Sequence, residues 1–596
     1  MQVIATAGHV DHGKSTLLRA LTGMEPDRWE EERRRGLTID LGFVWTGDTA
    51  FVDVPGHERF VTNMLAGVGP VPAVMLVVAA DEGWRVQTQE HLDIVDALGI
   101  RHGLLVVTRC DLAGPDRALA EARERLAGTG LEGVPAPAVS ALSGEGLPRL
   151  RAVLTELAGA MPEPDPAAGT RIWADRVFTA EGRGTVATAT LGEGTVRVGD
   201  TLLADGEPVR VRGLHSLGTP REEVSGPARV AVNLRGAAAS GIRRGTVLVT
   251  PDRWLPSAVV DVRLRPPGGT WRQAARHGGS APPRPPAREA VWHQGAAAVP
   301  ARVRRLGDDT ARITLARELP LRIGDRALLR DPGSRRVWGA TVLDVRPPEL
   351  RRRGAAAARA QELRSMDGVP DGTAELRRRG LVRRAELVAM GADPPESALA
   401  AGEWLADPGR WDALRDRLVR VVTARAAEHP HDPGLPAEAV RQALELPDRS
   451  LVDALAAGTG LSRVRGRLSA AAPELPPRLA RALETLTAEL EREPFAAPTA
   501  ERLAGLGLRP GDLAAAETAG RLVRIAPGVV LAPGCADRAV EILAALPQPF
   551  TAAQARQALN STRRVTIPLL EHLDRLGRTR RTTDSLREVT RGAGRE

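Results

Sequence analysis

The sequence is short of cysteine, and it contains no long apolar run. Its two cysteines, Cys110 and Cys535, lack metal-ligand spacing, which argues against a disulfide framework and a structural zinc site. No apolar run reaches the roughly 18–20 residues that a membrane span needs. No charged-then-apolar secretory signal follows Met1, which leads directly into a strand-like segment. These absences predict a cytoplasmic protein without a membrane partner.

Lysine is rarer still. It occurs once, at Lys14, while every other strongly basic residue is arginine. The abundance of Ala, Gly, Pro and Arg indicates a coding bias that replaces lysine wherever arginine suffices. A lysine that survives this bias is expected where a compact ammonium is needed and a planar guanidinium fails. Lys14 therefore marks a candidate site.

The length of 596 residues exceeds what one hydrophobic core supports, so we expect several domains. A formal net charge of +8 is compatible with a polyanionic partner. Arginines on solvated faces would give the same balance, so charge alone does not identify nucleic acid as the partner.

A phosphate-binding motif follows the first predicted strand. Residues Gly8–Ser15 fit G-x-x-x-x-G-K-[ST], between a strand at Val3–Ala7 and a helix that includes Leu17–Leu21. Glycines let backbone N–H groups approach phosphates, and the helix N-terminus adds its positive end. We expect Lys14 at the β- and γ-phosphates and Ser15 on Mg²⁺. The predicted loop comprises Gly8, His9, Val10, Asp11, His12, Gly13, Lys14, Ser15 and Thr16.

Two further elements indicate a nucleotide switch. Asp53 ends an apolar strand in Asp-Val-Pro-Gly, where its carboxylate can reach Mg²⁺ through water and the Gly56 N–H can sense the γ-phosphate. Thr38 lies in a polar segment before the second strand, where a switch threonine would close on Mg²⁺. Ser15 and Thr38 are therefore the predicted metal ligands.

The base-reading segment points to guanine. Asp111, in Thr-Arg-Cys-Asp after a buried strand, would accept from the guanine N1 and N2 donors, which adenine does not offer. A backbone N–H of Ser140, Ala141 or Leu142 would meet guanine O6. Arg109 can lie over the base. Thr108 replaces the usual asparagine, so we expect the loss of an amide that braces the loop. GTP and GDP are the predicted nucleotides.

The run Asp53–Met64 resembles the translational GTPases. This resemblance implies that His57 orients the attacking water when the ribosome engages, with Val10 as the apolar gate residue beside it. Without the resemblance, a surface histidine on a turn would look the same.

Short alternating strands follow the Pro-rich linker Met161–Pro166 and predict two β-barrels. The segments that resemble domains 2 and 3 of elongation factor Tu are Arg176–Phe178, Gly182–Thr188, Val198–Asp200, Ala311–Leu315, Gly324-Asp325 and Leu328–Pro332. Pro266–Arg288 is expected to be a flexible insertion. The resemblance implies a cradle for aminoacyl-tRNA.

The segment Gly36–Phe43 resembles the switch region of the selenocysteine-specific elongation factors. That family resemblance implies that Phe43, Arg176 and Arg229 surround the selenocysteine side chain. A selenol ionises well below pH 7, and two guanidiniums would stabilise the selenolate against neutral serine. Alternatively, both arginines are charges on a barrel surface.

Helical periodicity returns after the barrels, with a weak internal repeat of helix, helix and basic hairpin. This order is typical of winged helices. The last unit is the most basic, and its resemblance to the same family implies an mRNA-hairpin site at Arg563, Arg564, Arg580 and Arg581. A solvated basic face is the alternative.

The expected architecture is multidomain, with an α/β P-loop GTPase domain, two β-barrels and an array of winged helices. The predicted boundaries are 1–168, 169–252 and 253–348 for the GTP-binding domain and the barrels, then 349–426, 427–476, 477–540 and 541–596 for the winged helices.

The resemblance implies a monomeric, GTP- and Mg²⁺-dependent GTPase that delivers selenocysteyl-tRNA to the ribosome at UGA codons marked by an mRNA hairpin (SECIS). One alternative is another translational GTPase that delivers aminoacyl- or initiator tRNA. Another is a GTP-switched winged-helix regulator that binds nucleic acid. Asp111 disfavours a P-loop ATPase.

Overall fold

The computed structural model describes residues 1–26, 38–57, 60–69, 71–161, 163–180, 184–266, 286–334, 336–429, 434–464, 466–470, 477–582 and 586–590. The chain separates into two compact units, Met1–Glu396 and Ser397–Glu596. Most of the expected insertion at Pro266–Arg288 lies outside the described residues. None of the helices in the described part is both long and apolar enough to cross a membrane.

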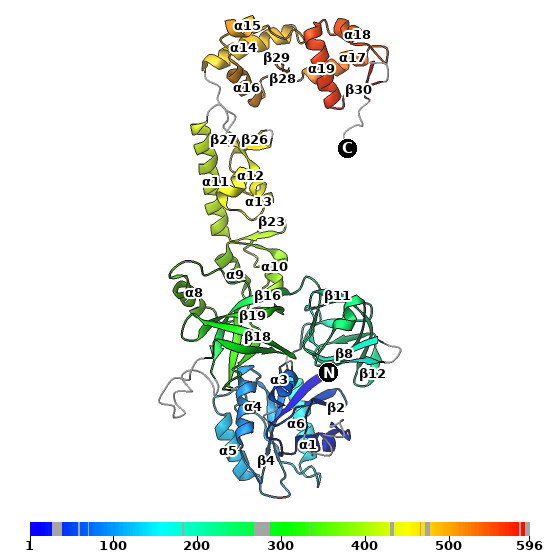
Figure 1. The fold of residues 1–596 in the computed structure, drawn as a ribbon, viewed down its shortest axis with the longest axis vertical. Helices are drawn as coiled ribbons and strands as arrows, with labels where there is room; N and C mark the ends of the chain where they lie inside the picture. The colour runs from blue at the N-terminus through cyan, green and yellow to red at the C-terminus, as the bar shows by residue number, and fades with distance from the viewer. Residues whose placement is uncertain are drawn as a thin grey trace. The chain divides into compact units, whose positions relative to one another are not determined.

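The first unit begins with a five-stranded sheet (Figure 1). Its order is β2 (Gly42–Thr46), β3 (Thr49–Asp53), β1 (Gln2–Ala7), β4 (Ala73–Ala79) and β5 (His102–Thr108), with β2 antiparallel at the edge. Every residue of β4 is buried, as expected for a parallel strand covered on both faces. The flanking helices are α1 (Lys14–Thr22), α3 (Val61–Val68), α4 (Val86–Ala97), α5 (Asp116–Leu126) and α6 (Leu147–Ala160).

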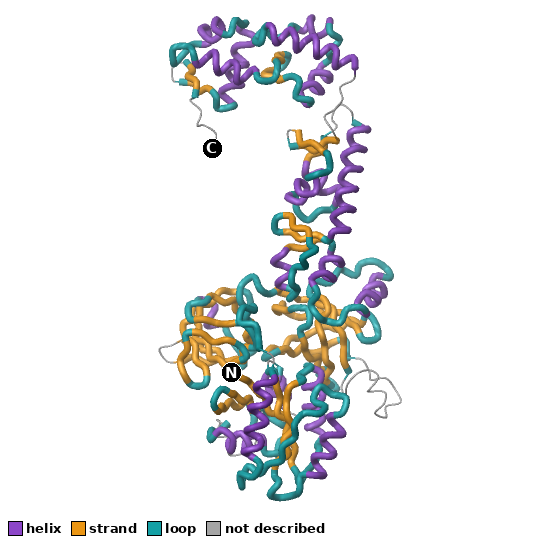
Figure 2. Tube along the Cα trace, turned by 180° about the vertical axis from the view of Figure 1, so that it is seen from behind, coloured by secondary structure: helices purple, strands orange, loops and turns teal. Residues whose placement is uncertain are grey.

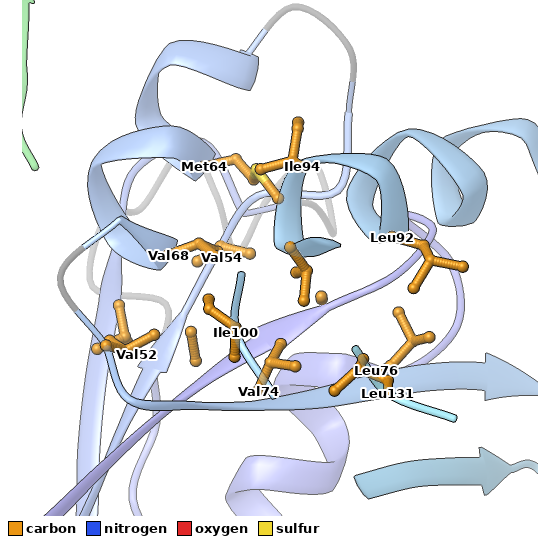
Figure 3. Close-up of a cluster of buried hydrophobic side chains, with 14 of the residues drawn as sticks. Val52, Val54, Met64, Val68, Val74, Leu76, Leu92, Ile94, Ile100 and Leu131 are labelled. Atoms are coloured by element: carbon orange, nitrogen blue, oxygen red, sulfur yellow. The ribbon is translucent and has the colours of Figure 1, made fainter. Parts of the chain in front are cut away.

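Apolar side chains fill both sides of this sheet. On one side, Val74 and Leu76 of β4 pack with Met64 and Val68 of α3 and with Leu92 of α4 (Figure 3). A second cluster on the other side holds Ile4, Leu17, Phe51, Met75 and Leu150. Burying one such side chain contributes about 1.5–3 kcal/mol, so the two clusters fix the strand ends that carry the polar loops.

The next domain is a closed β-barrel. Each of six strands pairs with the next and the last with the first: β10 (Thr201–Ala204), β15 (Val247–Val249), β6 (Arg171–Trp173), β8 (Gly184–Leu191), β14 (Ala228–Arg235) and β11 (Glu207–Ser216). Outside this ring lie β7 (Arg176–Ala180) on β8, β12 (Thr219–Arg221) on β11, the pair β9 (Thr195–Arg197) and β13 (Glu223–Ser225), and the short helix η2 (Ala237–Gly241).

A second closed barrel follows, visible as strands in Figure 2. Its order is β16 (Leu255–Arg265), β19 (Thr310–Leu321), β18 (Ala297–Arg305), β17 (Glu289–Gln294), β20 (Arg326–Arg330) and β21 (Val337–Asp344). Burial alternates along β18, so one face of the strand fills the interior while the other meets solvent. Trp292 and Trp338 are fully buried inside. Both predicted barrels are confirmed.

The first unit ends with α8 (Ala355–Arg364), α9 (Gly372–Arg379), β22 (Leu381–Arg383) and α10 (Arg384–Ala389). Arg359 of α8 is buried and pairs with Asp261 of β16 at 2.7 Å and with Asp344 of β21 at 2.5 Å. Removing one partner of a buried ion pair is strongly destabilising. Arg359 therefore holds α8 firmly on the second barrel.

The second unit contains three repeats of helices followed by a hairpin. Its elements are β23 (Leu399–Ala401), β24 (Trp404–Ala406), α11 (Pro408–Glu428), β25 (Leu435–Pro436), α12 (Ala437–Leu444), α13 (Ser450–Ala456), β26 (Leu461–Val464), β27 (Arg467–Ala470), α14 (Pro477–Arg492), α15 (Ala500–Gly505), α16 (Pro510–Thr518), β28 (Val523–Ala526), β29 (Val529–Leu531), α17 (Cys535–Ala544), α18 (Ala552–Ala558), α19 (Arg563–Arg575), β30 (Thr579–Arg581) and β31 (Arg587–Val589). A C-terminal winged helix is confirmed, while the boundaries of the individual repeats stay predictions.

Candidate functional site

The glycine-rich segment forms a tight loop between β1 and α1. Gly8 has a φ of 131°, and a Cβ there would lie 2.3 Å from the Val77 carbonyl oxygen, so the position requires glycine. Gly13 is left-handed and precedes α1, which begins at Lys14. The first N–H groups of a helix have no intrahelical acceptor, so those at Lys14, Ser15 and Thr16 can serve an anion.

The single lysine lies inside this loop. Lys14 is 3% exposed, and its ammonium donates to the carbonyl oxygens of Gly8 at 3.0 Å and His9 at 2.7 Å. A Cβ on Gly56 would lie 2.6 Å from the Lys14 Nζ, which shows how closely the Asp-Val-Pro-Gly turn approaches. The loop therefore holds a buried positive charge where phosphates are expected.

Two uncharged histidines, His91 and His12, support the phosphate loop through hydrogen bonds. Gly8 donates its N–H to Nδ1 of His91 on α4 at 2.9 Å, and burial lowers the pKa of His91 to about 3. His12 is fully buried, with Nδ1 3.1 Å from the Val77 carbonyl oxygen, and burial lowers its pKa to about 4. Both imidazoles are thus uncharged at neutral pH. The sequence did not single out His91.

Three oxygens meet where the metal is expected. Ser15 Oγ donates to Asp53 Oδ2 at 2.7 Å and lies 3.0 Å from Thr38 Oγ1. Thr6 of β1 donates to the other Asp53 oxygen at 2.7 Å, which fixes the carboxylate. Hydroxyl and carboxylate oxygens with a single acidic side chain suit Mg²⁺, which keeps several of its waters. The residues present therefore fit the ion.

The segment after β5 is tied to the phosphate loop. Thr108 is buried, and its hydroxyl donates to the His12 carbonyl oxygen at 2.7 Å. The expected amide is absent at position 108, and the Thr108 hydroxyl makes a bond to the loop in its place. Arg109 donates to the Asp11 carbonyl oxygen and pairs with Glu82 at 3.1 Å. Its guanidinium thus lies against the same loop.

The segment that carries Asp111 lies beside the loop after Val139. Asp111 is exposed, and Cys110 donates its N–H to the Val139 carbonyl oxygen at 3.2 Å, which brings the two loops together. The Ser140 N–H already donates to the Glu145 carbonyl oxygen at 3.0 Å. Of the three predicted residues, Ala141 and Leu142 are therefore the ones left to supply a donor to O6.

His57 directly follows the turn that contacts the phosphate loop. A Cβ on Gly56 would lie 2.6 Å from the Val10 backbone nitrogen, so His57 and the expected gate residue Val10 belong to neighbouring turns. The His57 ring is half-buried, with its centroid 6.0 Å from that of Phe60. His57 therefore follows directly on the turn that approaches the phosphate loop.

A second candidate site lies between the sheet domain and the first barrel. Phe43 of β2, Arg176 of β7 and Arg229 of β14 line one cavity of about 230 Å³. The Arg229 guanidinium lies 3.8 Å from the Phe43 ring centroid, and that of Arg176 lies 5.0 Å away. The structure thus brings together three residues that are far apart in sequence, with both cations on one aromatic ring.

Acidic partners that the sequence did not single out hold these arginines. Arg229 makes a two-point contact with Asp175, at 2.5 and 3.2 Å. Arg176 lies 3.4 Å from Asp40 and donates to the Leu41 carbonyl oxygen. Asp175 directly precedes Arg176, so a search for acidic neighbours of the predicted arginines would have found it.

The four C-terminal arginines differ in their surroundings. Arg564, at the start of α19, donates to the carbonyl oxygens of Ala497 at 2.7 Å and Pro498 at 3.0 Å. Arg580 pairs with Glu588 across the hairpin. Arg563 and Arg581 are exposed and have no ion pair within the described part of the chain. Those two are the more available for a ligand.

Comparisons with known proteins agree with this arrangement. Residues 1–160 match the family model described as the elongation factor Tu GTP binding domain. Residues 541–586 match the model described as the elongation factor SelB winged helix. Both ends of the chain thus match models of translation elongation factors.

Relatives and a solved structure extend the match. The chain is 43% identical over 272 residues to a selenocysteine-specific elongation factor of Desulfomicrobium baculatum, covering 44% of this chain and 43% of that protein. It is 33% identical over 381 residues to elongation factor Tu 2 of Streptomyces avermitilis, covering 57% of this chain and 96% of that protein. The crystal structure of a bacterial selenocysteine-specific elongation factor matches with a TM-score of 0.73 at 25% identity, covering 99% of this chain and 100% of that chain. The chain belongs to the SelB branch of the elongation factor Tu family.

Membership of the SelB branch confirms the resemblance seen in the switch region and the C-terminal repeat. The chain spans about half the length of the selenocysteine-specific relatives that it matches. The match to the SelB winged-helix model covers α18, α19 and the basic strand β30.

Proposed function

We propose that this chain is a GTP-dependent elongation factor that delivers selenocysteyl-tRNA to the ribosome at UGA codons marked by an mRNA hairpin. It works as a monomer in the cytoplasm. The observation that carries the proposal is the cavity in which Phe43 is covered by the guanidiniums of Arg176 and Arg229. The cavity lies between the first barrel and the sheet domain, whose residues 1–160 match the elongation factor Tu GTP binding domain.

The charge of this cavity supports an anionic side chain. Arg176 and Arg229 line the cavity, while their partners Asp40 and Asp175 do not, so its lining carries two guanidiniums and no carboxylate. A selenol is ionised at neutral pH and a serine hydroxyl is not. An ionised partner forms stronger hydrogen bonds with a guanidinium than a neutral one does. The cavity therefore favours selenocysteine over serine on the same tRNA.

The nucleotide is GTP, with Asp111 accepting from the guanine donors and Lys14 on the β- and γ-phosphates. Ser15 and Thr38 would hold Mg²⁺, which would neutralise charge on the phosphates, and Asp53 orients the Ser15 hydroxyl at 2.7 Å. The short bonds around these oxygens support the assignment. Loss of the γ-phosphate would remove an interaction partner of Gly56 and of Thr38. The segments around both residues would then loosen.

His57 orients the water that attacks the γ-phosphate when the ribosome engages. Its place in the chain, one residue after Gly56 in the turn that approaches the phosphate loop, supports this role. A half-buried imidazole can turn toward the nucleotide without breaking the core. Hydrolysis to GDP and phosphate then releases the tRNA.

The C-terminal winged helix binds the mRNA hairpin through Arg563 and Arg581, with Arg580 beside them on the hairpin β30–β31. Arginine contacts to backbone phosphates and splayed bases suit an RNA loop. The match of 541–586 to the SelB winged-helix model supports this assignment.

Single-turnover GTP hydrolysis on programmed ribosomes tests the proposal. The full chain is mixed with selenocysteyl-tRNA and ribosomes on an mRNA that carries UGA and a selenoprotein hairpin, with seryl-tRNA of the same body as the control. We expect rapid hydrolysis with selenocysteyl-tRNA and a much slower reaction with seryl-tRNA. Equal rates with both, or a rate independent of the mRNA hairpin, would contradict the proposed function.

A further inference from the structure

Asp40 lies between two arginines of the first barrel. One of its carboxylate oxygens is 3.4 Å from Arg176 Nε, and the other is 3.3 Å from Arg244 Nη1. Arg176 lies on β7, and Arg244 follows η2, so one acidic side chain of the sheet domain pairs with two separate parts of the barrel. A carboxylate shared by two guanidiniums restricts where both can lie.

The same short segment contacts the phosphate site. Thr38 Oγ1 lies 3.0 Å from Ser15 Oγ, two residues before Asp40. Asn63 of α3 donates to the Ile39 carbonyl oxygen at 2.9 Å, and Leu41 is buried in the core of the sheet domain. Thr38–Leu41 is therefore held at each residue, with one end at the phosphate loop and the other at the barrel.

Arg176 connects this segment to the cavity that it lines with Phe43 and Arg229, which we call the aminoacyl cavity. It forms an ion pair with Asp40 and donates to the Leu41 carbonyl oxygen. Its guanidinium also lies 5.0 Å from the Phe43 ring centroid. Arg229 differs, because its partner Asp175 belongs to the barrel itself and keeps it in place independently of the switch segment. Of the two cavity arginines, Arg176 is thus the one whose position depends on the nucleotide site.

We propose that Asp40 is a positioning residue that couples the nucleotide site to the aminoacyl cavity through Arg176 and Arg244. The inference rests on the proposed function. With GTP bound, Thr38 would be a ligand of the metal ion, and Asp40, two residues later, is then held where it orients Arg176 toward Phe43. When Thr38 is released, the pairing loosens, and the cavity loses one of its two oriented cations. Linkage requires that GTP and the aminoacyl-tRNA strengthen each other's binding by the same factor.

The test compares the affinity of the full chain for selenocysteyl-tRNA with a non-hydrolysable GTP analogue and with GDP. Asp40→Asn removes the charge and keeps the shape. We expect it to lower the ratio of the two affinities by about tenfold, within the range that coupled sites show. Affinity for the GTP analogue without tRNA should stay near that of the wild type. Asp48→Asn is the matched control, because Asp48 is an exposed aspartate in the turn after β2.

Three outcomes separate the inference from the proposed function. A wild type that binds selenocysteyl-tRNA equally with both nucleotides would overturn the proposed function, and the coupling with it. A wild type with the preference and an Asp40→Asn variant that retains it would overturn the coupling alone. So would a variant that loses tRNA affinity equally in both nucleotide states, since Asp40 would then only be part of the binding surface.

The reciprocal measurement distinguishes coupling from a structural role. Selenocysteyl-tRNA should raise the affinity of the wild type for the GTP analogue, and this gain should shrink by the same factor in Asp40→Asn. Arg244→Gln, which removes the more exposed partner, should show a smaller loss in the same direction. A reciprocal gain unchanged by Asp40→Asn would contradict the inference.

Discussion

The backbone N–H of Gly8 donates to Nδ1 of His91 across 2.9 Å, which joins the phosphate loop to the middle of α4. Nδ1 can accept this bond only when it carries no proton. Burial lowers the pKa of His91 to about 3, so the acceptor is available at neutral pH. The position of the phosphate loop thus depends on an uncharged His91, which accepts the Gly8 N–H.

We predict that acid destabilises the sheet domain through its buried histidines. As pH falls from 6.5 toward 4, the unfolded chain binds protons at His12 and His91 that the folded chain excludes. The free energy of unfolding therefore falls by about 1.4 kcal/mol per pH unit for each histidine. Hydrogen exchange of the peptides that contain β1 and α4, at pH 7 and pH 5, measures this loss.

His91→Asn provides the comparison, because its amide oxygen can still accept from Gly8. The variant should show a smaller loss of protection between pH 7 and pH 5. His215→Asn, at an exposed histidine of the first barrel, should behave like the wild type. An unchanged pH dependence in His91→Asn would show that this histidine is not the group responsible.

Replacing the single lysine should abolish tight nucleotide binding. Lys14→Arg puts a planar guanidinium where a buried ammonium reaches two carbonyl oxygens and packs against Gly56. Charge-assisted bonds contribute about 1.5–3 kcal/mol each, so we expect the affinity for a fluorescent GDP to fall about 100-fold or more. Arg19→Lys, on the exposed side of the same helix, should bind normally. Wild-type affinity in Lys14→Arg would contradict the assigned role.

Gly56→Ala should block the phosphate site. The added Cβ would lie 2.6 Å from both Lys14 Nζ and the Val10 nitrogen, so the turn has to move away from the loop. We expect weaker GTP binding and at least a tenfold slower hydrolysis, because a misplaced turn also displaces His57. Gly114→Ala is the control, since nothing lies within 4 Å of its added Cβ. Equal hydrolysis rates in the two variants would refute the predicted contact.

Neighbouring arginines at the start of α19 should have different roles. Arg564→Ala removes two hydrogen bonds to carbonyl oxygens of Ala497 and Pro498, so it should destabilise the C-terminal part by about 1–3 kcal/mol. Arg563→Ala should leave the melting temperature unchanged and weaken binding of an mRNA hairpin in a salt-dependent manner. Differential scanning calorimetry and hairpin titration of the full chain measure the two effects. A loss of stability in Arg563→Ala together with a loss of hairpin binding in Arg564→Ala would contradict both assignments.

Local motifs predicted the phosphate loop well, because Gly8–Ser15 acts within one turn between a strand and a helix. The cavity around Phe43 was predicted through family resemblance, since Arg176 and Arg229 lie in distant strands. Asp40 was not predicted, because pairing across domains leaves no periodic signal. Asp175 was not predicted, because its partner Arg229 lies 54 residues later in the chain. The bond of Thr108 was not predicted for a related reason: the residue type indicated only the lost amide, and the contact with His12 shows that a hydroxyl binds the loop in its place.

The same limit applies to the C-terminal repeat. The order of helix, helix and hairpin was predicted from spacing, and it occurs in α15, α16 and β28–β29 and again in α18, α19 and β30–β31. The separate role of Arg564 was not predicted, because its acceptors lie 67 and 66 residues earlier in the chain. Side-chain contacts of this kind follow from packing and not from local pattern.

Protection of the aminoacyl ester tests the central claim most directly. The full chain with GTP is mixed with selenocysteyl-tRNA or with seryl-tRNA of the same body, and the hydrolysis of each ester is followed over time. We predict strong protection of the selenocysteyl ester alone, and its loss in Arg229→Ala. Equal protection of both esters, or protection of ordinary aminoacyl-tRNAs, would contradict the assignment of selenocysteine to this cavity.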